Sequence, residues 1–107
     1  MKTLKFRLNL IPLILSGEKT STWRLFDDKD LQVGDTVELI NWDTKEVFRN
    51  AELTEVREKP LGEINDDDFE GHEKFESEEV MYETYRKYYG YKVGKNTIVK
   101  IIKFELI

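Results

Sequence analysis

The sequence predicts an α+β fold: a small β-barrel of mixed or mainly antiparallel strands with two main flanking helices. Three observations lead to this prediction. Several segments alternate apolar and polar residues with the period of a half-buried strand. Two other segments space their apolar residues as helices do, and each is followed by a glycine. The final segment, "NTIVKIIKFELI", is apolar on both faces, which is typical of a central strand or of a barrel strand covered by a helix.

The chain begins with the pattern of a strand, a short helix and a second strand. Apolar and charged residues alternate in "TLKFRL", which predicts a strand over 3–8. A short helix is expected over 10–16, because Pro12 in its first turn needs no backbone N–H. Gly17 suits the left-handed position that ends such a helix. The β-favouring residues that follow predict a strand over 19–25.

The middle of the chain has the pattern of two longer strands. "VGDTVELINW" contains a turn and then a strand over 36–41. After the turn "WDTK", the segment "EVFRNAELTEVRE" predicts a long strand over 46–57. Its apolar positions change phase between Leu53 and Val56, which indicates a β-bulge at that point.

The last part of the chain contains a second helix and a closing strand. Ser77 can cap a helix over 77–89, which has acidic residues in its first turn and basic residues in its last. The closing strand is expected over 96–106. The helix has an apolar stripe of residues spaced i, i+4 and i+7, namely Met81, Tyr85 and Tyr88.

Length and charge restrict the class of protein. The chain has 107 residues, enough for one core, so we expect a single domain over 1–107. A net charge of −5 argues against a broadly basic, non-specific nucleic-acid binder, but it is compatible with a small local basic site. We find neither a signal peptide nor a transmembrane segment. We therefore expect a cytoplasmic monomer that binds no membrane.

Composition also excludes several kinds of site. The absence of cysteine excludes disulfides, thiolate zinc sites and cysteine nucleophiles. His72 is the single histidine, which excludes His-rich metal sites and any mechanism that needs two imidazoles. We expect no metal and no cofactor.

The stretch "SGEKTSTWRL" gathers an amine, four hydroxyls and a guanidinium between two apolar segments. A hydroxyl such as that of Thr22 is a poor nucleophile unless a base removes its proton, and Lys19 is the available candidate. That lysine needs a lowered pKa, which burial or a nearby cation such as Arg24 can provide. The alternative is an ordinary surface strand rich in Lys, Thr and Arg.

Two further groups of residues have both a functional and a structural interpretation. The loop "NDDDFEGHEKFESEE" could coordinate a divalent cation, but its spacing fits no EF-hand, and a solvated acidic loop is the better default. In this loop Gly71, flanked by Glu70 and Glu73, would let the backbone pass close to another element. The tyrosines of the second helix could stack on bases, although at helical spacing they more often form core.

The opening motif resembles that of a known family. "GEKTSTWRL" is similar to the Gly-x-Lys-x-x-[Thr/Glu]-x-Arg element of ASCH domains, which share a β-barrel architecture with the PUA RNA-binding domain. Other segments follow in the order of that family: "LIPLILSGEKT", "LQVGDTVEL", "FEGHEKFES", "VMYETYRKYYG" and "TIVKIIKFELI". The resemblance implies a PUA-like fold for nearly the whole chain.

The sequence is also similar to one branch of the family, the bacterial N4-acetylcytidine amidohydrolases. This resemblance implies that Thr22 is the nucleophile that accepts the acetyl group and that Lys19 is its base. It implies that Glu73 orients the lysine or handles the proton of the leaving amine, with Glu70 as a possible substitute. The residues expected to bind substrate around this centre are Gly17, Thr20, Arg24 and Glu70. The partner would be a modified nucleoside or nucleotide.

Two alternatives belong to other classes of function. In a PUA-like binding module for RNA or a nucleotide, Lys19 and Arg24 would hold a phosphate and Thr20 and Thr22 would bond a base or ribose. In an ASCH-type ribonuclease, the acid and base would be Lys19 and Glu73.

A geometric expectation separates catalysis from binding. On a regular strand, Lys19 and Thr22 would face opposite sides, so we expect a turn or bulge over 18–20 and regular strand geometry only after it. The Nζ atom of Lys19 should then lie at hydrogen-bond distance from Thr22 Oγ1, or one water molecule away.

Overall fold

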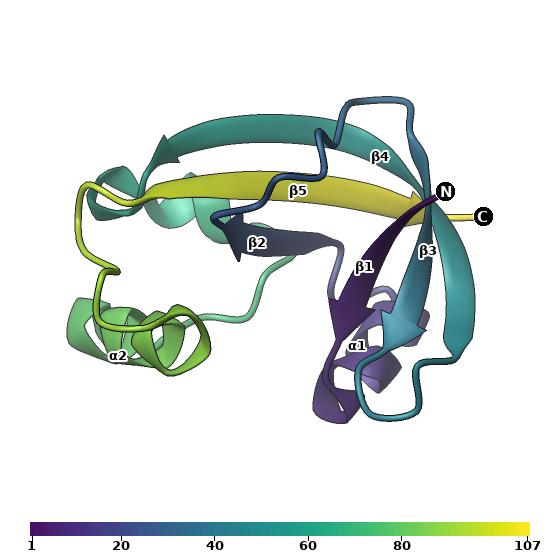
Figure 1. Cartoon of the computed structure of the whole chain (residues 1–107), viewed down its shortest axis with the longest axis horizontal. Helices are drawn as coiled ribbons and strands as arrows, with labels where there is room; N and C mark the ends of the chain where they lie inside the picture. The colour runs from purple at the N-terminus through teal and green to yellow at the C-terminus, as the bar shows by residue number, and fades with distance from the viewer.

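The computed structural model describes residues 1–107. The chain forms five strands, two α-helices and three short 3-10 turns, and Figure 1 shows how the labelled strands and α-helices are arranged. The strands are β1 (Lys2–Phe6), β2 (Ser21–Leu25), β3 (Thr36–Asn41), β4 (Val47–Pro60) and β5 (Ile98–Leu106). The helices are α1 (Ile11–Ser16) and α2 (Glu78–Tyr89), and the 3-10 turns are η1 (Leu8–Leu10), η2 (Leu61–Glu63) and η3 (Asp66–Phe69).

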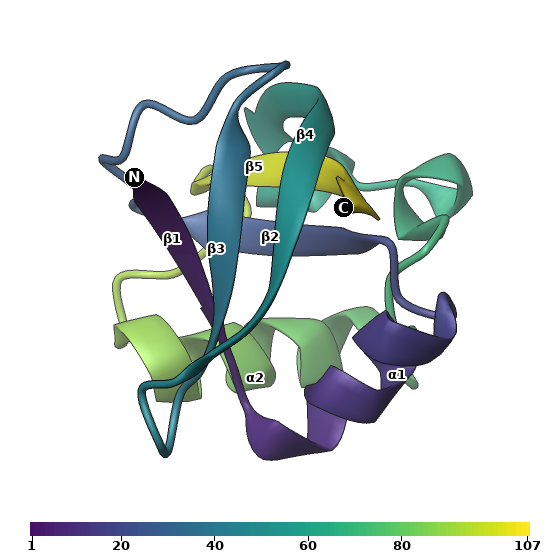
Figure 2. The same ribbon diagram turned by 90° about the vertical axis from the view of Figure 1, so that its right-hand side faces the viewer.

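All five strands form one sheet in the order β1-β3-β4-β5-β2. β1 is parallel to β3, and every other pair is antiparallel. The sheet curls strongly, so that in Figure 2 β5 and β2 run across behind the nearly upright β1, β3 and β4. The predicted α+β fold with a mixed, mainly antiparallel sheet is confirmed.

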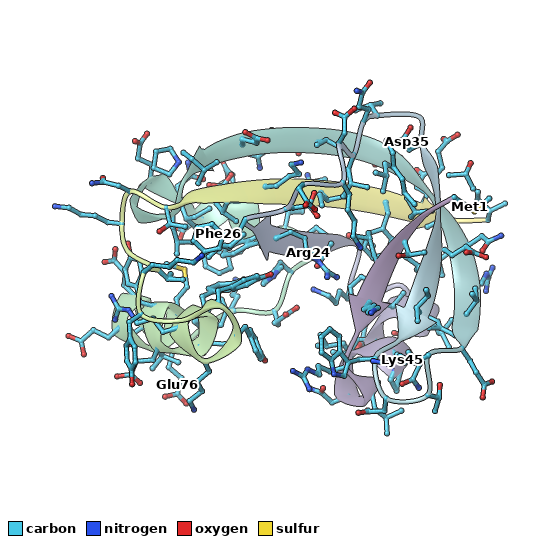
Figure 3. All side chains as sticks on the ribbon, in the orientation of Figure 1. Met1, Arg24, Phe26, Asp35, Lys45 and Glu76 are labelled. Carbon is cyan, nitrogen blue, oxygen red and sulfur yellow. The ribbon has the colours of Figure 1, made fainter.

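The sheet is a half-barrel whose two edge strands, β1 and β2, are joined through a side chain. No backbone pairing links β1 to β2. Instead, the Arg24 guanidinium of β2 donates a hydrogen bond of 2.8 Å to the carbonyl oxygen of Lys5 in β1. Figure 3 shows Arg24 between these strands. The residue that the sequence places in the functional motif therefore also holds the open edge of the barrel.

The strand boundaries agree with the predicted ones to within three residues; β2 and β5 each begin two residues later than expected, at Ser21 and Ile98, and two strand ends also differ. β1 ends at Phe6 rather than at residue 8, because Leu8 is exposed and begins η1. β4 continues to Pro60, three residues beyond the expected end at 57, since its last residues still pair with β5. The register of that pair shifts between Leu53 and Glu55, which confirms the predicted bulge.

Two hydrophobic clusters fill the fold. The larger contains eleven buried residues, contributed mainly by β1, β3, β4, β5 and α1. The smaller contains eight and joins β2 and β5 to α2, which lies below these strands in Figure 1. Met81 and Tyr85 anchor α2 in the smaller cluster, as expected, whereas Tyr88 is 57% exposed. No helix in the structure has the length and apolar character needed to cross a bilayer.

Candidate functional site

A cavity of about 430 Å³ lies between the β1 and β2 edges of the sheet and helix α2. Its size is that of a small-molecule site. Aromatic rings form much of its wall. Five cationic side chains also line it, but only one carboxylate does, that of Glu73. The aromatic residues are Phe6, Trp23, Trp42, Phe75, Tyr85, Tyr88 and Tyr89, and the cations are those of Lys5, Arg7, Lys19, Arg24 and Lys87.

The turn after α1 directs Lys19 into this cavity. Gly17 ends the helix with φ +86°, a left-handed conformation that favours glycine. The backbone N–H of Lys19 then donates to the carbonyl of Leu13 at 3.0 Å, and β2 begins only at Ser21. The expected irregular start of the strand is confirmed. As a result, the Lys19 side chain is 3% exposed and lines the cavity.

The loop before α2 is docked against the start of β2. The carbonyl of Gly71 accepts hydrogen bonds from the backbone N–H groups of Thr20 and Ser21, at 2.9 and 3.1 Å. Gly71 has φ +75°, and a Cβ atom there would lie 2.0 Å from the Thr20 hydroxyl oxygen. Any larger residue would therefore be strained at this φ and would displace either the Thr20 hydroxyl or the loop. This close approach, expected from the sequence, brings Glu73 to Lys19.

Lys19 and Glu73 form an ion pair at the wall of the cavity. The Nζ atom of Lys19 donates to Glu73 Oε2 at 2.6 Å. Burial lowers the pKa of Lys19, although the charge of Glu73 acts against that shift. Burial alone would raise the pKa of Glu73, but its neighbours His72 and Lys19 outweigh it and hold that pKa below its usual range. The predicted proximity of the two groups is confirmed.

His72 completes the inner wall and is neutral. Its ring stacks on that of Trp23, with centroids 4.1 Å apart. Burial, with the nearby charge of Lys19, lowers the pKa of His72 to about 4. The Nδ1 atom lies 2.7 Å from the carbonyl oxygen of Glu73, which can only accept, so Nδ1 carries the proton. His72 therefore orients the residue that follows it and carries no charge at neutral pH.

The Thr22 hydroxyl is held by Arg24 and not by Lys19. Arg24 Nε donates to Thr22 Oγ1 at 3.2 Å, and Thr22 is almost fully buried at the cavity wall. No direct hydrogen bond joins Lys19 to Thr22, so of the two expected arrangements the direct contact is absent, and an approach through one water molecule stays a prediction. The physical reason is that a carboxylate is a stronger acceptor for a buried ammonium than a hydroxyl is, and Glu73 is within reach. Because Arg24 donates to Thr22, the hydroxyl keeps its own proton free to give away.

The other residues that the sequence predicts to bind substrate, apart from Arg24, do not line the cavity. Gly17 and Thr20 belong to the turn that positions Lys19, and neither lines the cavity. Glu70 also lies outside it and pairs with Lys103 at 3.5 Å. The carboxylate in the cavity is therefore that of Glu73. The metal-binding interpretation of the acidic loop gains no support, because Asp68 is paired with Arg57 and Lys59 at 2.7 Å each.

Sequence reasoning missed the cavity's outer wall. Trp42 comes from the turn between β3 and β4, Arg7 from the end of β1, and Lys87 and Tyr88 from α2. These segments are far apart in the sequence and meet only because the sheet curls. The aromatic stripe of α2 was the one available signal.

Comparison with known proteins supports the fold. No family model and no curated protein matches the sequence. An ASCH domain from Lactobacillus crispatus JV V101 superposes with a TM-score of 0.73 at 18% identity, over 98% of this chain and 79% of that one. A hypothetical protein, PH0355, matches over the full length of both chains with a TM-score of 0.75 at 23% identity. The ASCH protein of Zymomonas mobilis gives 0.68 at 13% identity, over 96% of this chain and 65% of that one. Together with the order of its motifs, these likenesses show that the chain has the ASCH-domain fold.

Proposed function

We propose that the protein is an amidohydrolase that removes the acetyl group from an N4-acetylcytidine-like nucleoside. One observation supports this proposal most: Lys19, Thr22 and Glu73, the three residues that the family resemblance names, line a single cavity from two segments of the chain. The cavity's aromatic walls are suited to a flat base, and its volume is suited to a small molecule. The substrate would lie with its acetyl group toward Thr22.

The proposed reaction begins with the Thr22 oxygen adding to the acetyl carbonyl carbon. Lys19 takes the hydroxyl proton through one water molecule, because no direct hydrogen bond joins the two groups, and its amine must be neutral to do so. The proton that Lys19 must first lose has an acceptor at 2.6 Å, the Glu73 carboxylate. Since the Glu73 side chain is 38% exposed, a bound substrate that covers it would disfavour the charged pair and favour this transfer.

Arg24 stabilises the negative charge that develops on the carbonyl oxygen, because its guanidinium already contacts the attacking hydroxyl. The C–N bond then breaks, and the exocyclic nitrogen takes the proton from Lys19 and leaves as the amine of cytidine. Lys19 next removes a proton from water, which attacks the acetyl ester on Thr22. Lys19 returns this proton to the Thr22 oxygen as the ester C–O bond breaks, so the hydroxyl is restored, acetic acid leaves and the net reaction consumes one water molecule.

The test is turnover of N4-acetylcytidine, followed by chromatographic separation of cytidine. The wild type should release cytidine, Thr22→Val should lose this activity, and Thr22→Ser, which keeps the hydroxyl, should retain part of it. Thr54→Ala is a matched control, because Thr54 is exposed on β4 outside the cavity. Full activity of Thr22→Val would exclude Thr22 as the nucleophile.

A second candidate is a nucleotide-binding module without catalysis. The excess of cations and aromatic rings around the cavity favours it, because such walls bind phosphates and bases without any reaction. Binding of cytidine without any turnover of its N4-acetyl derivative by the wild type would favour this candidate over the enzyme.

A further inference from the structure

Three cations at the mouth of the cavity have no negative partner in the protein. Lys19 is paired with Glu73, and Arg24 is bonded to Thr22 and to a backbone carbonyl. Lys5, Arg7 and Lys87 also line the cavity, and no carboxylate lies within 4.0 Å of any of them. Most other Lys and Arg side chains of the protein also lack a carboxylate partner, but these three differ from them because they line one cavity, whose single carboxylate is already paired with Lys19.

Aromatic rings hold two of these cations at the mouth. Lys5 Nζ lies 5.4 Å from the centre of the Trp42 ring, and Arg7 Cζ lies 4.7 Å from it. The backbone N–H of Trp42 donates to the carbonyl of Phe6 at 2.8 Å, which fixes the tryptophan beside β1. Arg7 Cζ is also 5.7 Å from the centre of the Tyr88 ring on α2. Arg7 therefore contacts rings from both sides of the mouth while its N–H groups keep their hydrogen-bonding capacity.

The two ends of the cavity differ in chemistry. The inner end carries the Lys19 and Glu73 pair and the Thr22 hydroxyl, whereas the outer end carries the cations without partners and the exposed Trp42 and Tyr88 rings. A nucleoside whose N4-acetyl group reaches Thr22 would direct its sugar toward the mouth. This orientation rests on the proposed function.

We propose that Lys5, Arg7 and Lys87 form a phosphate subsite, so that the preferred ligand is a nucleoside monophosphate and not the free nucleoside. A guanidinium matches two phosphate oxygens at once, and the two lysines add point charges. A mononucleotide fits better than RNA, because the surface outside this cavity is acidic overall and would repel a chain of phosphates.

The test compares the binding of cytidine 5′-monophosphate with that of cytidine by isothermal titration calorimetry at low salt. We expect the wild type to bind the monophosphate at least roughly tenfold more tightly, as charge-assisted hydrogen bonds to one phosphate predict. The preference should fall with added salt and should be lost in Arg7→Gln and in Lys87→Gln. Lys95→Gln is the matched control, since Lys95 is exposed outside the cavity, and it should keep the wild-type preference.

The outcomes separate the subsite from the proposed reaction. Equal affinity of the wild type for cytidine and its monophosphate would overturn the subsite, even if N4-acetylcytidine is hydrolysed. A preference for the monophosphate that depends on Arg7 would support it, even without any hydrolysis. A short cytidine oligonucleotide that binds more tightly than the mononucleotide would overturn the mononucleotide assignment. Thermal melting of each variant should match that of the wild type, because these side chains contribute no core packing.

Discussion

Removing Glu73 should destabilise the protein far more than removing Lys19, although the two residues form one ion pair. In Glu73→Gln the Lys19 ammonium remains, 3% exposed, without a negative partner. In Lys19→Met the buried charge itself is gone, and a side chain of similar length fills its space. Glu73 is then left alone, but at 38% exposed it stays in contact with water.

The size of the difference follows from the cost of a buried charge. Breaking a buried pair costs roughly 3–5 kcal/mol, and the cost cannot exceed the free energy of deprotonating a lysine at pH 7, about 5 kcal/mol. Because water reaches this pair through Glu73, we expect roughly 2–3 kcal/mol for Glu73→Gln, a fall in Tm of roughly 10–20 °C. For Lys19→Met we expect a change within about 1 kcal/mol.

The effect should also depend on pH. Burial already places the pKa of Lys19 in the folded protein below its unfolded value, and loss of Glu73 lowers it further. The cost is fully present below the folded pKa and disappears as pH rises to the unfolded value, since lysine then carries no proton in either state. The stability deficit of Glu73→Gln should therefore shrink between pH 7 and about pH 10.

Thermal unfolding followed by circular dichroism measures these differences, with the wild type as the reference at each pH. The double variant Lys19→Met with Glu73→Gln should recover most of the stability that Glu73→Gln loses, because it contains no buried charge. If the two single variants lose equal stability, or if Lys19→Met loses more, Lys19 is not the member of the pair whose buried charge depends on its partner.

Two further predictions concern the elements that build the site. Arg24→Lys should lower both turnover and Tm, because Arg24 bonds Thr22 and the Lys5 carbonyl from two separate nitrogens, Nε and Nη2, which the single nitrogen of an ammonium does not reproduce. Activity assays and melting curves check this, and a fully active Arg24→Lys would show that only the charge matters. Gly71→Ala should destabilise the protein by roughly 1–3 kcal/mol and lower turnover, because the new methyl group would displace the loop that carries Glu73. Wild-type activity and melting in Gly71→Ala would contradict the close docking of this loop on β2.

The sequence predicts local structure well where a single residue or a change of pattern reveals what the backbone must do. Gly17 marks the end of α1, and the change of phase after Leu53 marks the bulge in β4. The bounds of β3 agree with the expected 36–41. The end of β1 was less visible, because Leu8 continues the alternating pattern although it lies in η1. Alternation in sequence does not show where a strand loses its pairing partner.

The site was predictable in part, and for a different reason. Family resemblance indicated Lys19, Thr22 and Glu73, and the cavity contains all three. The hydrogen bonds among them depend on distances between β2 and the loop before α2, which no local pattern encodes. Lys19 therefore bonds Glu73, and Arg24 bonds Thr22. The outer wall with Trp42 forms only through the curl of the whole sheet.

The most direct test of the account is a double-variant comparison of kcat/KM for N4-acetylcytidine with Lys19→Met, Thr22→Val and their combination. If Lys19 and Thr22 act together in one reaction, each single change should remove most of the activity, and the combination should be about as active as the weaker single variant. If the fold decreases in kcat/KM of the two single variants multiply in the double variant, the joint mechanism is contradicted. A wild type without turnover would contradict the proposed reaction itself.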